Sequence, residues 1–411
     1  MNVSRQEQQA VMLINLGDVR IAQSKLLEAL NAYQQSLTIL KRLADQDKSN
    51  FALQQDLGAD YERVANARVL QGKLSEALNA YQQSLTIFRR LVDQDKSNSR
   101  WQRNLAVDFE KFAGVLAEQG KLPEALDAYQ QSLIIFRRLV DQNKFNSDLQ
   151  RNLAVNFEKS ADVLVLQGKL PEALDTYQQS LSILKRLADQ DKSNFVLQQD
   201  VAVGSSKFAD VLVLQGKFAE ALDTYQQSIT TLKRLTDQDK SNFVVQSDLA
   251  VCYEKFGTVL AAQRKLPDAL DAYEQSLKIR QTLAEKDKSN TDLQRELSVG
   301  YDKVGDVLTA QGDLTGALNY YRDALAITEK LVSQEPSNVD WQNAAAWNRY
   351  CVAKVLIKIK DGDRNEAKRL ILEAIDIMTR LEHQGALDAD AQDTLNKLNE
   401  IATALTSSSR K

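Results

Sequence analysis

The spacing of apolar residues predicts a chain made almost entirely of helices. Between Leu122 and Leu139 the apolar side chains recur at steps of three and four residues, which places them on one face of an α-helix. The preceding segment, residues 99–119, has a similar apolar face that includes Trp101 and Phe109. Only a short turn separates the two segments. We therefore expect them to form a pair of antiparallel helices.

This two-helix pattern repeats every 48 residues. A tyrosine of the second helix marks each copy: Tyr33, Tyr81, Tyr129, Tyr177, Tyr225, Tyr273 and Tyr321. A small residue at one position of each helix, such as Ala113 and Ala125, would let the paired helices approach closely. A period of this length is typical of solenoids, in which each unit buries its apolar face against the next.

Glycine and asparagine are expected to mark the turns. Glycines at one position of the repeat would end the first helix with a tight turn: Gly72, Gly120, Gly168, Gly216 and Gly312. Ser24 and Arg264 stand at this position in two other repeats. Between repeats, Asp-Gln-Asp-Lys-Ser-Asn or a close variant is expected to break the second helix and to cap the next one.

A basic pair recurs in the closing turns of the second helices, for example Arg89-Arg90. Such pairs could form a row for phosphates or nucleic acid. We interpret them instead as structural, because cations there offset the carbonyl end of the helix dipole and have an aspartate four residues on, such as Asp93.

Composition and charge favour a non-catalytic protein. The net charge of −4 over 411 residues creates no basic field that would attract nucleic acid or an anionic membrane. The chain has one histidine, His383, and neither a phosphate-binding glycine-rich loop nor a Cys/His cluster. Cys252 and Cys351 are interpreted as buried small apolar residues. We therefore expect no enzyme, no metal and no cofactor.

The start of the chain shows no signal peptide, and no uncharged apolar run reaches the roughly 20 residues that a membrane helix needs. The expected location is cytoplasmic.

Two repeats carry the residues of a known family. Tyr253, Phe256, Gly257, Leu260, Ala269 and Tyr273 resemble the tetratricopeptide pattern, and the segment from Leu297 to Ile327 resembles the long-helix tetratricopeptide repeats common in bacteria. The period of 48 residues exceeds the usual length of about 34 by two helical turns in each helix. The predicted fold is thus all-α, a right-handed α-solenoid of antiparallel helix pairs.

We divide the chain into three parts. Residues 1–335 would form seven tandem helix pairs, with the first helix of the first pair as the N-terminal cap. Residues 336–384 would form a degenerate eighth pair, and residues 385–411 a capping helix followed by a polar tail from Thr406.

The resemblance implies a binding surface. In tetratricopeptide arrays the first helices line the concave face and contact the ligand. On this chain that face carries a row of acids beside a row of bases. The predicted partner-binding residues are Glu62, Arg63, Asn66, Glu110, Lys111, Glu158, Lys159, Asp162, Lys207, Asp210, Glu254, Lys255, Asp302, Lys303 and Asp306. Such rows can orient an extended partner of complementary charge.

A simpler interpretation stays open for these charges. Lys159 and Asp162, like Lys207 and Asp210, are three residues apart, so they could pair along one helix and form a solvated face. The family's carboxylate clamp, which holds acidic tails with Lys and Asn, is not reproduced.

The predicted function is a scaffold or adaptor that holds a segment of a partner protein along the concave face. The alternative is a sensor or regulatory subunit of a bacterial signalling or defence complex whose effector enzyme is on another chain. Self-association through the ends of the solenoid is a further possibility. Neither nucleic acid nor a membrane is expected as a partner.

Overall fold

A computed structural model describes residues 3–408, in which 17 α-helices and no β-strands are found. The chain forms two compact units, Met1–Gln215 and Gly216–Lys411. The N-terminal unit contains α1 (Val3–Ala22), α2 (Leu26–Gln46), α3 (Phe51–Leu70), α4 (Leu74–Gln94), α5 (Ser99–Glu118), α6 (Leu122–Gln142), α7 (Ser147–Leu166), α8 (Leu170–Gln190) and α9 (Phe195–Leu214). The C-terminal unit contains α10 (Phe218–Gln238), α11 (Phe243–Ala262), α12 (Leu266–Lys286), α13 (Thr291–Gln311), α14 (Leu314–Gln334), α15 (Val339–Lys358), α16 (Arg364–His383) and α17 (Ala389–Ser408).

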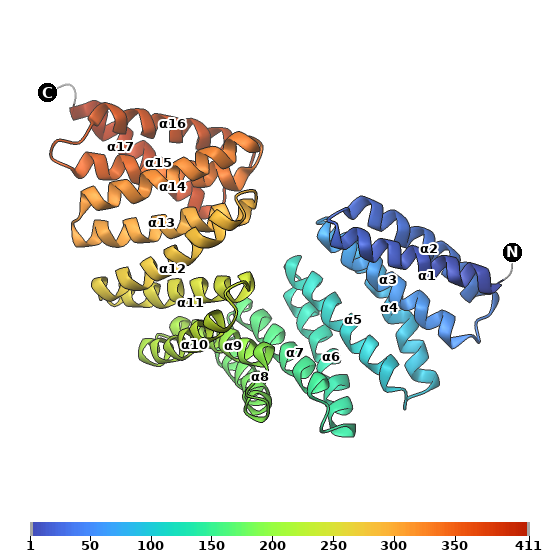
Figure 1. The fold of residues 1–411 in the computed structure, drawn as a ribbon. Helices are drawn as coiled ribbons and strands as arrows, with labels where there is room; N and C mark the ends of the chain where they lie inside the picture. Colours follow the sequence, from blue (N-terminus) through green and yellow to red (C-terminus); the bar gives the residue numbers. More distant parts are fainter. Residues whose placement is uncertain (1–2, 409–411) are drawn as a thin grey trace. The chain divides into compact units, whose positions relative to one another are not determined.

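Each unit is a stack of helical hairpins (Figure 1). In the N-terminal unit α1 pairs with α2, α3 with α4, α5 with α6 and α7 with α8, and the second helix of each hairpin also packs on the first helix of the next. The C-terminal unit repeats this order from α11 to α16, and α17 packs on α16. The prediction of an all-α fold built as an α-solenoid is confirmed.

A left-handed residue lies in each of the hairpin turns from α1–α2 to α13–α14, and the turn between α15 and α16 has none. Gly120 has φ +74°, and the amide of Lys121 donates to the carbonyl oxygen of Leu116 at 2.9 Å, which satisfies the end of α5. Ser24 and Arg264 adopt the same conformation, with φ +58° and +59°. A side chain with a Cβ atom is strained there, so these two repeats keep the turn at some cost.

An asparagine starts the first helix of each repeat from the second onward. At α7 the side chain of Asn146 accepts a hydrogen bond from the amide of Leu149 at 3.0 Å. The loop before it is also held locally in most repeats: the hydroxyl of Ser97 donates to Asp95 at 2.6 Å, which lowers the pKa of that aspartate. These contacts fix the direction in which each new hairpin leaves the preceding one.

The core forms where small residues of the first helix meet the marker tyrosine of the second. Ala113 and Ala125 are completely buried, and Tyr129 packs in the same cluster. A Cβ atom placed on Gly305 would lie 2.8 Å from the ring of Tyr321, so a larger residue here would require this ring to shift. Large residues such as Phe136 fill the space between successive hairpins.

The basic pairs differ from the prediction in position and partner. The second helices run on past the pair, and the last turns of α2, α4, α6, α8 and α10 hold no basic residue. The guanidinium of Arg89 lies 4.9 Å from the ring centre of Phe109 in the next repeat, and Arg90 donates to Gln54. The basic residues therefore contact neighbouring helices. This differs from the predicted pairing with an aspartate four residues later on their own helix.

The last helix runs to Ser408, so it includes the first three residues of the predicted polar tail, and residues 409–411 lie outside the described residues. No helix in the described part of the chain combines the length and apolar content needed to cross a membrane.

Candidate functional site: a ladder of ion pairs between repeats

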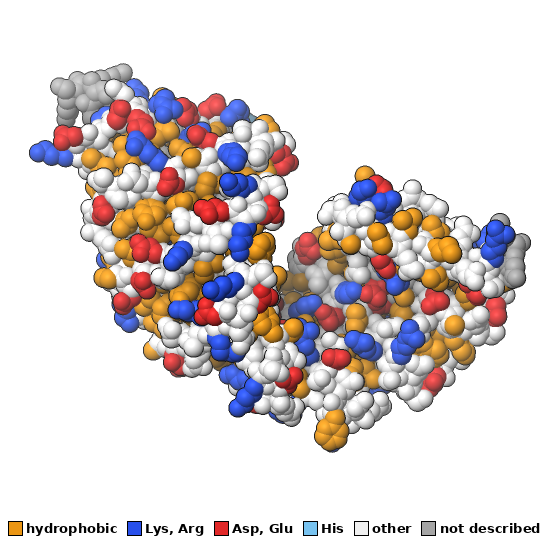
Figure 2. Space-filling model, in the orientation of Figure 1, with side chains coloured by type: hydrophobic (Ala, Val, Ile, Leu, Met, Phe, Trp, Pro, Cys, Tyr) orange, Lys and Arg blue, Asp and Glu red, His pale blue; other side chains and the backbone are white. Residues whose placement is uncertain are grey.

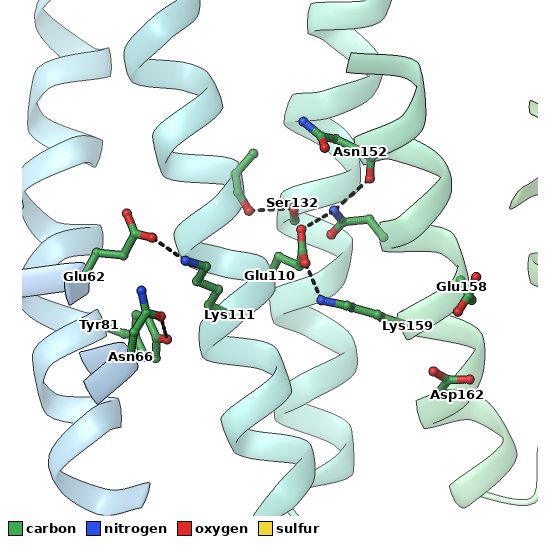
Figure 3. A network of polar contacts seen from close by, with 12 residues as sticks. Glu62, Asn66, Tyr81, Glu110, Lys111, Ser132, Asn152, Glu158, Lys159 and Asp162 are labelled. Atoms are coloured by element: carbon green, nitrogen blue, oxygen red, sulfur yellow. Dashed lines mark hydrogen bonds and ion pairs between the residues drawn. The ribbon is translucent and has the colours of Figure 1, made fainter. Parts of the chain in front are cut away.

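The predicted charged residues of the N-terminal unit form ion pairs between neighbouring repeats. Lys111 Nζ on α5 lies 2.5 Å from Glu62 Oε1 on α3, and Lys159 Nζ on α7 lies 2.5 Å from Glu110 Oε1 on α5. Lys207 Nζ on α9 continues the series, 2.7 Å from Glu158 Oε1 on α7. We call these three ion pairs the ladder. Figure 3 shows its first two rungs across successive first helices.

The ladder arises because a glutamate and a lysine are adjacent on α5 and on α7. On α5, Glu110 binds the lysine of the following repeat and Lys111 binds the acid of the preceding repeat. These two helices are thus tied on both sides, and α3 and α9 form the ends of the ladder. The 48-residue period copies this arrangement, so each rung joins residues 49 positions apart. This pairing differs from the one suggested by residues three apart on one helix.

The rungs are half-buried and supported by further hydrogen bonds. The side chains of Lys159 and Glu110 are 43% and 14% exposed. Asn156 donates from Nδ2 to Glu110 Oε2 at 2.9 Å. Lys207 also lies 2.9 Å from Asp162 Oδ2; burial lowers its pKa, but the Glu158 and Asp162 carboxylates outweigh this and raise it above its usual range.

Several marker tyrosines donate a hydrogen bond to a polar residue of the first helix that lies one turn beyond the ladder acid. Tyr81 donates to Asn66 Oδ1 at 2.5 Å, as Figure 3 shows, and Tyr177 donates to Asp162. In the C-terminal unit Tyr321 donates to Asp306 at 2.6 Å. The predicted residues Asn66, Asp162 and Asp306 are therefore oriented by a phenol of their own hairpin.

A second polar column lies beneath this face and was not predicted. Asp60, Asp108 and Asn156 occupy one position of the repeat on α3, α5 and α7, and all three are 0% exposed. Burial raises the pKa of Asp60 to about 7 and that of Asp108 well above its usual range. The sequence signal was a polar residue at one position of three successive repeats, in helices whose buried positions are otherwise mostly apolar.

The Asp108 carboxyl has a partner that fits its protonated form. Ser84 Oγ lies 2.5 Å from Asp108 Oδ2 and 2.8 Å from the carbonyl oxygen of Gly58. Because a hydroxyl has a single hydrogen, a protonated Asp108 can donate to Ser84 while Ser84 donates to Gly58. At this position the hydrogen bonds of Ser84 join α3, α4 and α5.

Arg63 lies at the N-terminal end of the ladder, beside a cavity. Its Nε is 3.6 Å from Asp18 Oδ1. The cavity, of about 630 Å³, lies among α1, α3 and α5 and is lined by Arg63, Asp56, Arg100 and Arg103. Burial raises the pKa of Asp56, and Arg100 and Arg63 offset part of this shift. Glu7 is a second acid of the lining, so three arginines face two acids, and this excess makes the cavity suitable for an anionic group.

The ladder does not continue unchanged in the C-terminal unit. Glu254 on α11 binds the buried Arg280 of α12, with Nη2 2.6 Å from Oε2. Lys255 lies on the same helix, and Asp302, Lys303 and Asp306 lie on α13. Asp210 is the remaining predicted residue and is half-buried on α9 of the N-terminal unit.

On the face formed by the first helices, acidic side chains are paired with basic ones. Figure 2 shows Lys and Arg side chains intermingled with Asp and Glu over the visible face of each unit. Within residues 3–408 no three His, Cys, Asp or Glu side chains are grouped so that they could hold a metal ion. The arrangement can present fixed charges of alternating sign to another molecule.

Comparison with known families and structures agrees with this architecture. The family model for the tetratricopeptide repeat matches residues 249–287 and 301–337, which lie mainly in the α11/α12 and α13/α14 hairpins. A search of the curated proteins finds no match.

Three solved structures have a similar fold. The apo form of RapI has a TM-score of 0.58 at 13% identity, covering 98% of each chain. BtubC (BKLC) from P. vanneervenii has a TM-score of 0.51 at 21% identity, covering 63% of this chain and 92% of its own. The S. pombe nuclear import adaptor Nro1 has a TM-score of 0.50 at 11% identity, covering 73% of this chain and 99% of its own.

Proposed function

We propose that this tetratricopeptide repeat protein is a non-catalytic scaffold or adaptor that binds a segment of a partner protein along the first helices of its repeats. The observation that carries the proposal is the ladder. Successive first helices present charged side chains that are already fixed by bonds between repeats, and a fixed surface loses little side-chain entropy on binding.

The ladder would supply orientation more than affinity. Because each acid has a lysine partner, the face has little net field, but its charges alternate at fixed positions. Complementary charges on a partner segment would then define its direction and register, and like charges would exclude other partners. Adaptors need this kind of selectivity.

The cavity beside Arg63 would bind one end of the segment. Arg63, Arg100 and Arg103 line it together with Asp56, whose ionisation burial disfavours. An acidic side chain or a terminal carboxylate of the partner would find two or more guanidinium groups there. The partner segment would thus run from this cavity along the ladder. The proposed location of this adaptor is the cytoplasm.

A charge swap tests the proposal without removing a rung. In the double variant Glu110→Lys/Lys159→Glu the ion pair can still form, but the presented charges are inverted. The wild type and the variant would each capture proteins from the native cell, and the captured proteins would be quantified by mass spectrometry at two salt concentrations. We expect the variant to lose partners that the wild type retains.

The control swaps a pair at a hairpin turn. Arg68 Nε lies 3.1 Å from Glu76 Oε2, at the end of α3 and the start of α4. The variant Arg68→Glu/Glu76→Arg should keep the full set of partners. Equal capture by all three proteins, with unchanged dependence on salt, would reject the face as the contact surface.

A further inference from the structure

A cavity of the C-terminal unit lies where the ladder is interrupted. It has a volume of about 610 Å³ and lies among α13, α15 and α17. Asp302, Asp306, Asn343, Trp347 and Asn348 line it from α13 and α15, and α17 contributes further acids and Lys397. The cavity therefore lies on the first helices that carry the predicted binding residues, under the last helix of the chain.

The repeat register explains why Asp302 has no lysine partner. Asp302 occupies the position of Glu62, Glu110 and Glu158, each of which binds the lysine 49 residues later. The residue 49 positions after Asp302 is Cys351, which is 4% exposed. Within residues 3–408 no lysine or arginine nitrogen lies within 4.0 Å of the Asp302 carboxylate.

Three of the four other acids that line the cavity have partners. Asp306 accepts the hydrogen bond from Tyr321, Asp388 caps α17 by accepting from the amide of Ala391 at 2.8 Å, and Asp393 pairs with Lys397. The fourth, Asp390, is exposed to solvent, whereas Oδ1 of Asp302 is buried. Burial and the nearby Asp306 raise its pKa well above the usual range, and Lys303 offsets part of this shift.

Three acceptor oxygens around the cavity lack a donor. Oδ1 of Asp302, of Asn343 and of Asn348 are each buried without a hydrogen-bond partner. Asn348 is 1% exposed, and its Nδ2 is directed to Ser298 and Thr328, at 3.3 and 3.4 Å. An unpaired buried acceptor costs free energy, and an ammonium group with three donors suits such a cluster.

We propose that this cavity binds the side-chain ammonium of a lysine from the partner segment, with Asp302 as the counter-charge. The ammonium takes the place that a ladder lysine takes in the earlier repeats, and the indole of Trp347 covers the aliphatic part of the side chain. The inference rests on the proposed function, because it names one residue of the segment that the first helices would hold.

The test selects peptides on the full chain. Random heptapeptides displayed on phage would be selected on the wild type, on Asp302→Asn and on Glu76→Gln, with folding of each checked by circular dichroism. We expect the wild type to select peptides with a lysine at one fixed position. Asp302→Asn should bind these peptides about tenfold more weakly or worse, and Glu76→Gln, whose acid pairs with Arg68 at a hairpin turn outside the ladder, should keep the preference for lysine.

A second variant introduces a lysine 49 residues after Asp302, at the position that ladder lysines occupy in earlier repeats. Cys351→Lys places a lysine where the ladder has one, so it should pair with Asp302 and compete with the lysine of the peptide. Cys351→Ala is its control and should bind like the wild type. A selected lysine peptide that binds Asp302→Asn and Cys351→Lys as tightly as the wild type overturns the inference.

The outcomes also separate this inference from the proposed function. Peptides that are selected without a lysine, and that lose binding in the Glu110→Lys/Lys159→Glu variant, leave the scaffold role standing and reject the lysine site. Arginine in place of lysine at the fixed position would reject the ammonium group and retain a cation site. Failure to select any peptide would count against both.

Discussion

Lys159 of α7 binds Glu110 of α5, Nζ to Oε1 at 2.5 Å, so a contact between two repeats uses residues 49 positions apart. The same spacing joins Lys111 to Glu62. The period thus builds a continuous set of ties along the first helices, and their contribution can be measured one rung at a time.

A double-mutant cycle measures the Lys159–Glu110 rung. The variants Lys159→Met and Glu110→Gln, alone and together, should show a coupling free energy of about 0.5–1 kcal/mol, because the lysine is 43% exposed and partly screened by solvent. Urea unfolding at low and high salt would provide the values. A coupling near zero at low salt would contradict the ladder.

The tyrosine contact offers a matched pair of substitutions. Tyr177 donates to the Asp162 carboxylate, whereas Tyr129 in the neighbouring repeat faces Gly114, which has no side-chain acceptor. We expect Tyr177→Phe to lower the free energy of unfolding by about 1.5 kcal/mol, and Tyr129→Phe to have a much smaller effect. Similar decreases in the free energy of unfolding in the two variants would show that the hydrogen bond from Tyr177 to Asp162 does not stabilise the fold.

The buried Asp60 should make stability depend on pH. Its pKa is about 7 in the folded protein and near 3.8 in the unfolded chain. Folding therefore takes up a proton between these pH values, so stability falls as the pH rises from about 4 to 7 and stays lower above that range. The loss is about 1.4 kcal/mol for each unit of the shift.

Asp60→Asn tests this dependence with a residue that the repeat already uses, since Asn156 occupies the equivalent position. The amide stays neutral, so the variant should be more stable than the wild type at pH 8 and similar to it at pH 4.5. Thermal unfolding across this range would check the prediction. Parallel stability curves for the two proteins would mean that Asp60 does not hold its proton.

The turn between α11 and α12 should be improved by glycine. Arg264 has φ +59°, where five other repeats have glycine and the first repeat has Ser24, and such a conformation costs a residue with a Cβ atom about 1 kcal/mol. Arg264→Gly should therefore raise the free energy of unfolding by about 1 kcal/mol. The reverse change, Gly120→Ala, should lower it similarly, since no atom lies within 4 Å to clash with the new Cβ and only the backbone conformation is strained.

The helices and turns could be predicted because their causes are local. The spacing of Leu122 to Leu139 and the glycine at position 120 each act within one hairpin, and the structure has α6 over Leu122–Gln142 after a left-handed Gly120. The contacts between hairpins, in contrast, depend on how neighbouring hairpins are placed. Lys159 could pair with Asp162 on its own helix or with Glu110 on the next, and only the placement of neighbouring hairpins decides between them.

The buried polar column and the α13–α15–α17 cavity escaped prediction for related reasons. Asp60 and Asp108 look like solvated residues unless the orientation of the first helix is known. Cys351 stands in the lysine column, but the loss of a partner for Asp302 matters only once the ladder is recognised. A capping helix was expected within residues 385–411, and α17 lies at Ala389–Ser408, but the sequence did not indicate which side chains of α13 and α15 it would lie beside.

Hydrogen–deuterium exchange of the full chain, alone and with a captured partner, tests the central claim most directly. If the first helices bind the partner, protection should increase in α3, α5 and α7 and in the peptides that carry Glu62, Glu110 and Glu158. Protection confined to α4, α6 and α8, with the first helices unchanged, would contradict it.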